Sequence, residues 1–183
     1  LQALEPALNP VFEKALWVQD SYSVNSPGAV VKAYADAFVA RGGQIQNAEL
    51  RTLLSAANGH WQVVDGSGQT QDFGRVVVAL GPWAPQFLAD LGVDIPMGFE
   101  RGYHMHYSSL DDAQLRHSIC DAQGGYVLAP MAQGIRLTTG IEFAKSSDQA
   151  NDIQLSRCEA LARKLYPLGE RLDPEPWLGR RPC

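Results

Sequence analysis

Cysteine, long apolar stretches and excess positive charge are all scarce in this chain of 183 residues. The three cysteines, Cys120, Cys158 and Cys183, lie far apart, with no Cys-x-x-Cys pair and no histidine at metal-ligand spacing. This pattern argues against a disulfide framework or a zinc site and favours a reducing compartment. The longest apolar stretches, such as residues 76–80, are far shorter than the roughly 20 residues that cross a membrane. The sequence therefore predicts no transmembrane segment.

The charge balance is mildly acidic, with 15 Lys and Arg against 20 Asp and Glu and a formal net charge of −5. Such a chain is a poor partner for nucleic acid or anionic lipid. The sequence starts at Leu1 without the charged-then-apolar pattern of a signal peptide. We expect that residues preceding Leu1, with any targeting information, have been removed, and that the protein is cytoplasmic, either free or peripheral to the inner membrane.

Hydrophobic periodicity divides the start of the chain into short elements. Residues 16–24 read as a strand, and Ser26-Pro27-Gly28 supplies a capping serine and a first-turn proline for a helix that ends at Gly42. The helix carries an apolar stripe, which we expect to lie on a sheet. Its members are Val30, Val31, Tyr34, Ala37, Phe38 and Val39. A short strand over residues 44–50 follows.

Turn residues next predict a hairpin and a further strand. Asn58-Gly59 is the strongest hairpin signal in the chain and joins strands over residues 50–56 and 60–65. The turn at residues 65–68, with sequence Asp-Gly-Ser-Gly, leads into a strand over residues 69–73.

Residues 75–80 contain a continuous run of β-branched side chains, which is typical of a strand covered on both faces in a parallel sheet. Gly81 follows at the carboxyl end, where ligands of open α/β sheets bind and where a glycine lets a ligand approach the backbone. The alternative is a plain turn into the helix that we expect from Pro85 to Gly92. The pattern alone favours neither interpretation.

The second half reads as an antiparallel meander followed by a helix. Alternation in residues 95–107 places Arg101 and Tyr103 on one strand face and His104 and His106 on the other. The two histidines resemble a metal pair but have no third ligand nearby, so we expect half-buried polar residues and no metal site. Strands follow over residues 124–130, where Tyr126 could present its hydroxyl to a ligand, and over residues 134–143.

Residues 151–166 carry apolar side chains at helical spacing and are ended by Pro167, which predicts an amphipathic helix on the meander. We expect its charged face to be solvated. That face contains Arg157, Glu159, Arg163 and Lys164.

The last residues form a stiff cationic segment, with Arg180 and Arg181 between Trp177 and Pro182. An arginine fork held by proline beside an aromatic ring can grip a carboxylate in two-point geometry. The alternative is a surface arginine pair with salt-bridge partners.

Several short motifs, taken in order, resemble a known family. They are Glu5-Pro6-Ala7-Leu8, Ser26-Pro27-Gly28 with Arg41-Gly42-Gly43, Val76 to Ala84, Arg101-Gly102-Tyr103-His104, Tyr126 to Pro130 with Arg136 to Gly140, and Trp177 to Pro182. This series resembles the FAD-dependent D-amino acid oxidase superfamily, and most closely its bacterial D-amino acid dehydrogenase branch.

The resemblance implies a two-lobed flavoenzyme of which this chain is the middle portion. The fold class expected is α+β, with a mixed, largely antiparallel sheet and flanking helices. Residues 1–30 and 84–176 would form the substrate lobe, and residues 31–83 and 177–183 would belong to the split FAD lobe. The Gly-x-Gly-x-x-Gly turn that receives the FAD pyrophosphate does not occur in this sequence. We therefore expect FAD in the complete enzyme and neither FAD nor activity in this chain alone.

The resemblance also assigns site residues. Arg181 matches the position that holds the substrate carboxylate, and Tyr126 matches a tyrosine that assists it, although one extra residue before Pro130 loosens that match. Tyr103 and His104 match a strand that borders the substrate cavity, with the inward face of that strand left open. The last positions, which lie against the cofactor, are Leu50, Leu80, Gly81 and Pro82. No acid–base residue and no metal ligand is implied.

The activity implied is oxidation of a D-amino acid, or of a similar small amine acid, to the imine and then to a 2-oxo acid, with electrons passing to an unidentified oxidant. One alternative is a sarcosine- or glycine-oxidase-like enzyme or another amine oxidase of the superfamily. The other alternative is a cofactor-free module that binds a small ligand.

Overall fold

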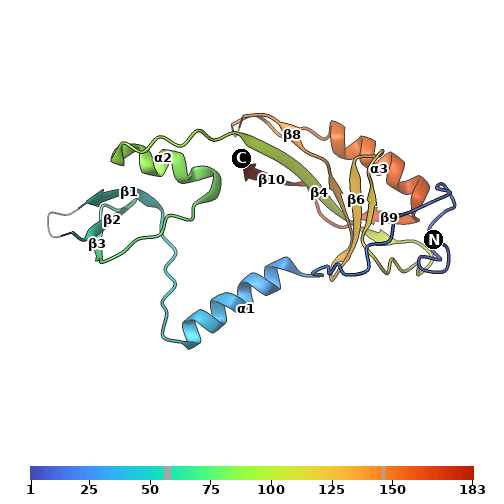
Figure 1. The fold of residues 1–183 in the computed structure, drawn as a ribbon, viewed down its shortest axis with the longest axis horizontal. Helices are drawn as coiled ribbons and strands as arrows, with labels where there is room; N and C mark the ends of the chain where they lie inside the picture. The colour runs from blue at the N-terminus through green and yellow to red at the C-terminus, as the bar shows by residue number, and fades with distance from the viewer. Residues whose placement is uncertain (56–58, 146) are drawn as a thin grey trace. The chain divides into compact units, whose positions relative to one another are not determined.

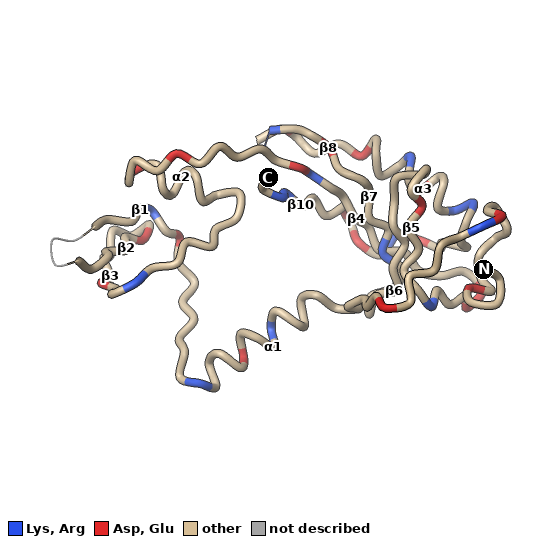
Figure 2. The backbone as a smooth tube through the Cα atoms, in the orientation of Figure 1, with Lys and Arg blue, Asp and Glu red and all other residues tan. Residues whose placement is uncertain are grey.

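The computed structural model describes residues 1–55, 59–145 and 147–183, which fall into two compact units (Figure 1). The first unit contains residues 1–33, 101–143 and 147–179, and the second contains the other described residues. Lys and Arg are interspersed with Asp and Glu along both units (Figure 2), as the mild net charge implies. The predicted lobe boundaries stay a prediction.

An antiparallel sheet forms the centre of the first unit. Its strand order is β10-β4-β7-β6-β5, and β8 and β9 pair with other parts of β4. The strands are β4 Phe99–Ser109, β5 Ile119–Asp121, β6 Tyr126–Met131, β7 Gly134–Thr139, β8 Glu142–Phe143, β9 Leu168–Arg171 and β10 Trp177–Pro182. β4 pairs antiparallel with β7 and β9, and β6 pairs antiparallel with β5 and β7. The predicted α+β class with a largely antiparallel sheet is confirmed.

Helix α3, Ile153–Leu165, covers one face of this sheet (Figure 1). It confirms the helix predicted over residues 151–166, and it ends where Tyr166 turns to extended backbone before Pro167. Its apolar face packs into one core with the sheet, and each fully buried leucine or methionine side chain there stabilises the fold by about 1.5–3 kcal/mol. The core includes Leu155, Ala162 and Leu165 of the helix and Met105, Leu128 and Leu137 of the strands.

The prediction of a solvated charged face on α3 is wrong for Glu159. Its carboxylate accepts hydrogen bonds from Arg163 Nε at 2.9 Å, Arg171 Nε at 3.0 Å and the Tyr107 hydroxyl at 2.9 Å. Burial raises the pKa of Glu159, and the hydrogen bonds from Arg171, Arg163 and Tyr107 outweigh it, so that the pKa lies below its usual value. Glu159 therefore joins α3 to β4 and β9 as an anion.

Helix α1, Pro27–Ala40, begins and ends as predicted, with Gly42 in the left-handed region at φ +89°. The large side chains of its apolar stripe, however, are uncovered, and their exposed fractions run from 42% at Val30 to 76% at Tyr34. The expectation that this stripe lies on a sheet is wrong for the described structure. An amphipathic pattern directs a face toward an apolar surface, and no such surface covers α1 within the described residues.

The strand predicted over residues 16–24 is also wrong. This backbone joins neither sheet of the described chain, and the side chains of Leu16 and Tyr22 are 91% and 98% exposed. Strand propensity is expressed only when a neighbouring edge supplies hydrogen bonds and a packing surface.

The second unit contains a three-stranded antiparallel sheet in the order β1-β2-β3. Strands β1, Leu50–Ser55, and β2, Trp61–Asp65, confirm the predicted hairpin, although Asn58 of the expected turn lies outside the described residues. Strand β3, Thr70–Phe73, confirms the next prediction; in the turn before it, Asp65 Oδ1 accepts from the backbone N–H of Ser67 and Gln69. The strand predicted over residues 44–50 is wrong except at Leu50.

Residues 75–80 do not form the predicted buried strand, and Val77 is 89% exposed. A β-branched run favours extended backbone, but this run has no ladder partner among the described residues. The helix predicted from Pro85 to Gly92 is confirmed as helix α2, Ala84–Leu88, which continues into the 3₁₀ turn η2, Ala89–Leu91, with Gly92 at φ +70° as the stop. A separate 3₁₀ turn, η1 Gly81–Trp83, precedes α2. Within the described ranges, no helix has the length and apolar character needed to cross a bilayer.

Candidate functional site

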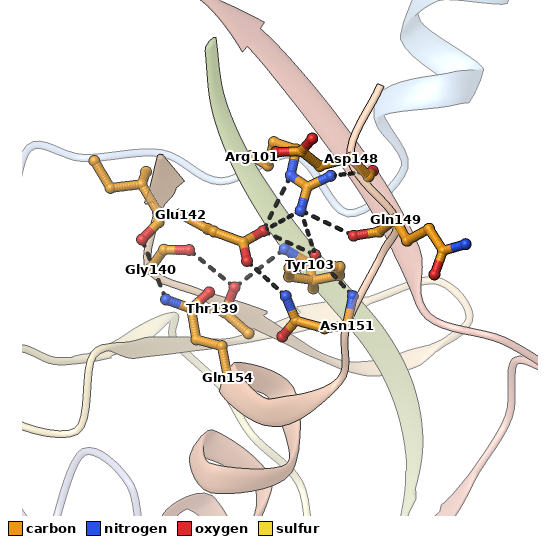
Figure 3. Close-up of polar contacts among 10 residues, drawn as sticks. Arg101, Tyr103, Thr139, Gly140, Glu142, Asp148, Gln149, Asn151 and Gln154 are labelled. Carbon is orange, nitrogen blue, oxygen red and sulfur yellow. Dashed lines mark hydrogen bonds and ion pairs between the residues drawn. The ribbon is translucent and has the colours of Figure 1, made fainter. Parts of the chain in front are cut away.

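A buried arginine on β4 joins several segments of the first unit (Figure 3). Arg101 is 1% exposed, and its Nε and Nη2 donate to Glu142 Oε2 at 3.0 and 2.7 Å. Its Nη1 and Nη2 also donate to the carbonyl oxygens of Asp148 at 2.6 Å and Gln149 at 3.2 Å. One guanidinium therefore holds β4, β8 and the loop that precedes α3.

Two further side chains complete this cluster. The Tyr103 hydroxyl donates to Glu142 Oε2 at 2.9 Å and accepts from the backbone N–H of Asn151 at 3.2 Å, while Asn151 Nδ2 donates to Glu142 Oε1 at 2.6 Å. Burial raises the pKa of Glu142, but the hydrogen bonds from Arg101, Asn151 and Tyr103 outweigh it and leave the pKa below its usual value. We call Arg101, Tyr103, Glu142 and Asn151 the Arg101 clasp; its charges are paired with one another, so it serves the fold.

Tyr103 and Tyr126 lie in one row of the sheet, on either side of Thr139. Tyr126 is the register partner of Thr139, and the Tyr103 backbone N–H donates to Thr139 Oγ1 at 3.1 Å. Both rings are buried in the core under α3. The Tyr126 hydroxyl has no hydrogen-bond partner in the described part of the chain, and burial and then the nearby Asp121 carboxylate raise its pKa. Two predicted substrate residues thus lie on the helix-covered face.

His104 lies on the opposite, open face, as the predicted alternation requires, and pairs in register with Thr138. Its ring stacks on Trp177 at a centroid distance of 4.6 Å. Burial first, and then the positive charge of Arg136, lowers the pKa of His104 to about 4. His104 is therefore neutral at physiological pH.

His106 connects an acid to an arginine on the same open face. Asp173 Oδ2 lies 2.8 Å from both the backbone nitrogen and Nδ1 of His106, and Arg136 Nε donates to His106 Nε2 at 3.1 Å. Because arginine can only donate, His106 Nε2 carries a lone pair and Nδ1 carries the proton that Asp173 accepts. Burial raises the pKa of Asp173, and its hydrogen bonds from His106 outweigh this and leave the pKa low.

Arg181 lies in the last part of β10, which belongs to the second unit because the division between the units falls after Gly179, and its side chain is 68% exposed. Its Nε donates to Glu100 Oε2 at 2.8 Å, and its Nη2 donates to the same oxygen. This geometry matches the surface ion-pair alternative. The carboxylate-binding role of Arg181 stays a prediction.

The predicted cofactor residues also lie in the second unit. Gly81 adopts φ +55°, and a Cβ added there would meet no heavy atom within 4 Å. Its backbone is therefore open to solvent, as it also is at Gly68. Leu80 and Pro82 are half-buried beside it, and Leu50 is exposed at the start of β1. The assignment of these four residues to FAD stays a prediction.

The structure therefore divides the predicted site residues between the two units. Tyr103, His104 and Tyr126 lie in the first unit, and Arg181 and the four predicted cofactor residues lie in the second. Sequence reasoning missed Glu142, Asn151 and Asp173 as partners of those strand residues. They lie 9 to 67 positions from the groups they bind, so no local pattern points to them. Arg136 was accessible to prediction, because alternation in β7 places it on the face opposite Ile135 and Leu137.

Comparison with known proteins identifies the family. The family model described as FAD dependent oxidoreductase, DAO, matches residues 1–183, and the chain belongs to this family. A D-amino-acid oxidase of Bradyrhizobium diazoefficiens is 27% identical over 97% of this chain and 43% of its own length. A D-amino acid dehydrogenase of Rhizobium rhizogenes is 31% identical over 58% of this chain and 26% of its own length.

A solved structure shows the same fold. The glycine oxidase of Geobacillus kaustophilus superposes with a TM-score of 0.68 at 18% identity, over 84% of this chain and 41% of the other. The chain thus spans less than half the length of these relatives. The family resemblance predicted from the sequence motifs is confirmed.

We expect Glu142→Gln to lower the free energy of unfolding by about 3 kcal/mol, because it leaves the buried Arg101 charge without its counter-ion. Urea unfolding followed by circular dichroism measures this loss. The matched control is Glu100→Gln, which breaks the exposed pair with Arg181 and should cost about 0–1 kcal/mol. Equal losses in the two variants would show that the Arg101 clasp contributes no more than a surface ion pair.

We expect stability to fall as the pH drops from about 6.5 towards 4. In this window the unfolded chain protonates His104 and the folded chain does not, so acid favours unfolding. The slope should stay below the one-proton limit of about 1.4 kcal/mol per pH unit, because His104 is only half-buried. Urea midpoints across this range check the effect. His104→Gln should flatten the slope, and an unchanged slope in that variant would contradict the assignment to His104.

Proposed function

We propose that the protein oxidises a D-amino acid, or a similar small amine acid, to the imine, which water converts to a 2-oxo acid and ammonia. The proposal is supported chiefly by the family match over residues 1–183, and by the D-amino-acid oxidase relative aligned along 97% of the chain. FAD, when bound, supplies the hydride acceptor for this chemistry. The residues of this chain would bind and orient the substrate, so that positioning is their contribution.

Arg181 would hold the substrate carboxylate. Its pairing with Glu100 demonstrates that its Nε and Nη2 can converge on a carboxylate oxygen. Because the pair is exposed, Glu100 contributes at most about 1 kcal/mol, and a substrate carboxylate could replace it at small cost. A charge-assisted contact of this kind contributes about 1.5–3 kcal/mol to binding.

The other three predicted substrate residues would contribute differently. His104 presents a neutral ring on the open face of the sheet, where it can donate or accept a hydrogen bond without attracting a second carboxylate. Tyr103 would act indirectly, because its hydroxyl is committed to the Arg101 clasp. The hydroxyl of Tyr126 is buried near the Asp121 carboxylate, so Tyr126 would support the shape of the site from within the core.

For the cofactor, we propose that the backbone at Gly81, with Leu80 and Pro82, forms a wall against FAD. The open space beside Gly81 supports this role. Leu50 would contact the adenine end. The pyrophosphate would need donors beyond these residues, because no Gly-x-Gly-x-x-Gly turn occurs in residues 1–183.

The test of the substrate class is anaerobic bleaching of the flavin in the complete protein by D-amino acids, L-amino acids, glycine and N-methylglycine. We expect D-amino acids to bleach it fastest. Arg181→Gln should raise the KM for the best substrate about tenfold through loss of one charged contact. The neighbouring Arg180→Gln is the matched control and should leave KM within about twofold, as expected for a surface change.

Preferential bleaching by glycine or N-methylglycine would instead favour the glycine- or sarcosine-oxidase-like alternative. An unchanged KM in Arg181→Gln would remove Arg181 from the substrate site while leaving the oxidation itself intact.

We expect Gly81→Ala to lower the FAD content of the purified complete protein, because a methyl group would enter the space beside the backbone. Alanine in the left-handed region also costs about 1–2 kcal/mol of stability. Gly68→Ala carries the same strain at φ +83°, also with open space around the added methyl, and serves as the control. The ratio of flavin absorbance to protein absorbance measures the effect. Equal flavin content in the two variants would contradict the role of Gly81.

A further inference from the structure

A small cavity lies against Arg136 on the open face of the first unit's sheet. Its volume is about 190 Å³. It is lined by residues 25–28 at the start of α1, by residues 131–133 in the β6–β7 turn, and by His106 and Arg136. This is below the roughly 300–1,000 Å³ of sites for drug-sized ligands. The space suits a small molecule with a few heavy atoms.

The guanidinium of Arg136 is only partly used by the protein. Its Nε donates to His106 Nε2 at 3.1 Å, and within the described residues its two amino groups make no hydrogen bond. A guanidinium has five N–H donors in a fixed planar fork, so both amino groups remain able to bind a ligand. Arg136 differs in this respect from Arg101, whose three nitrogens all donate to protein oxygens.

The support for Arg136 is rigid. His106 is 4% exposed, and Asp173 Oδ2 accepts from both its backbone N–H and its Nδ1–H at 2.8 Å. This double contact fixes the ring, and the ring in turn fixes the Nε side of the guanidinium. A cation held in this way loses little side-chain entropy when a ligand binds, which increases affinity.

The charge around the cavity favours an anion. Arg136 is the cation among the lining residues, and no Asp or Glu lines the cavity. Asp173 lies behind His106, outside the lining, so its carboxylate orients the ring without occupying the space. The neutral polar side chains of Asn25, Ser26 and Gln133 add hydrogen-bonding capacity.

We propose that this cavity is a binding site for a small carboxylate, which the two amino groups of Arg136 hold in a planar, two-point contact. Planar carboxylates match the guanidinium fork better than spherical or tetrahedral anions do. The ligand class is a short-chain organic acid whose carboxylate faces Arg136 and whose apolar end faces Met131 and Pro27. The site needs no flavin, so it stands apart from the proposed oxidation.

Isothermal titration of the complete protein with sodium acetate at constant ionic strength tests the proposal. We expect saturable binding that Arg136→Gln weakens about tenfold or more, the loss expected for one charge-assisted contact. Arg157→Gln, which removes an exposed charge on α3, is the matched control and should bind acetate as the wild type does. Absence of saturable binding in the wild type, or equal binding by wild type and Arg136→Gln, would overturn the proposal.

Further variants and a second anion test whether the bound acetate contacts Arg136. Arg136→Lys retains the charge but lacks the planar fork, so it should bind acetate several-fold more weakly than the wild type even if the glutamine variant fails to fold. Loss of acetate binding in Arg181→Gln but not in Arg136→Gln would place the site at Arg181 and overturn the proposal. Tighter binding of inorganic phosphate than of acetate would overturn the carboxylate assignment. Shifts of the Arg136 side-chain ¹⁵N resonances on addition of acetate provide a direct readout in the wild type.

Discussion

A buried guanidinium must have its charge paired and its donors satisfied, and Arg101 meets this requirement with groups from two other segments, β8 and the loop before α3. Glu142 supplies the counter-ion, and the carbonyl groups of Asp148 and Gln149 bring in the loop that leads to α3. The helix then starts at Ile153, immediately after Asn151 has bonded to the same glutamate. The buried ion pair therefore holds the segment that leads into α3, while the hydrophobic core and Glu159 hold the helix itself on the sheet.

The two faces of β4 carry residues with different roles. Alternation puts Arg101 and Tyr103 under α3, where their polar groups serve the fold, and puts His104 and His106 on the other face. On that open face the hydrogen bonds are arranged differently. His106, which is held by Asp173, accepts one hydrogen bond from Arg136 and leaves the other donors of Arg136 available. An arginine whose donors are all bonded to protein stabilises structure, whereas one with unsatisfied donors beside a cavity is equipped to bind a ligand.

The sequence predicted the antiparallel sheet and α3 well, because their signals are local. Alternation in β4, the β6–β7 turn and helical spacing in residues 153–165 each depend on neighbouring residues. The prediction failed for residues 16–24 and 75–80 and for the apolar stripe of α1. In all three cases the sequence pattern favours a segment that pairs with a strand edge or packs on an apolar surface. The described chain provides no such edge or surface there. Propensity indicates what a segment would do beside a partner and does not supply that partner.

The candidate site was less predictable for a related reason. The partner of Arg101 lies 41 residues away and the partner of His106 lies 67 residues away, so chain folding alone brings them together. The motifs of the resembling family pointed to Arg181 and Gly81. A motif, however, does not say which groups contact its residues or how exposed they are. In the structure Arg181 is held by Glu100, and Gly81 faces open space. A weak exposed ion pair can be displaced and an open glycine surface can be covered, so both observations leave room for a ligand. Tyr103 is the contrasting case, because its hydroxyl could reach a ligand only by giving up Glu142 and weakening the clasp that holds the segment leading into α3.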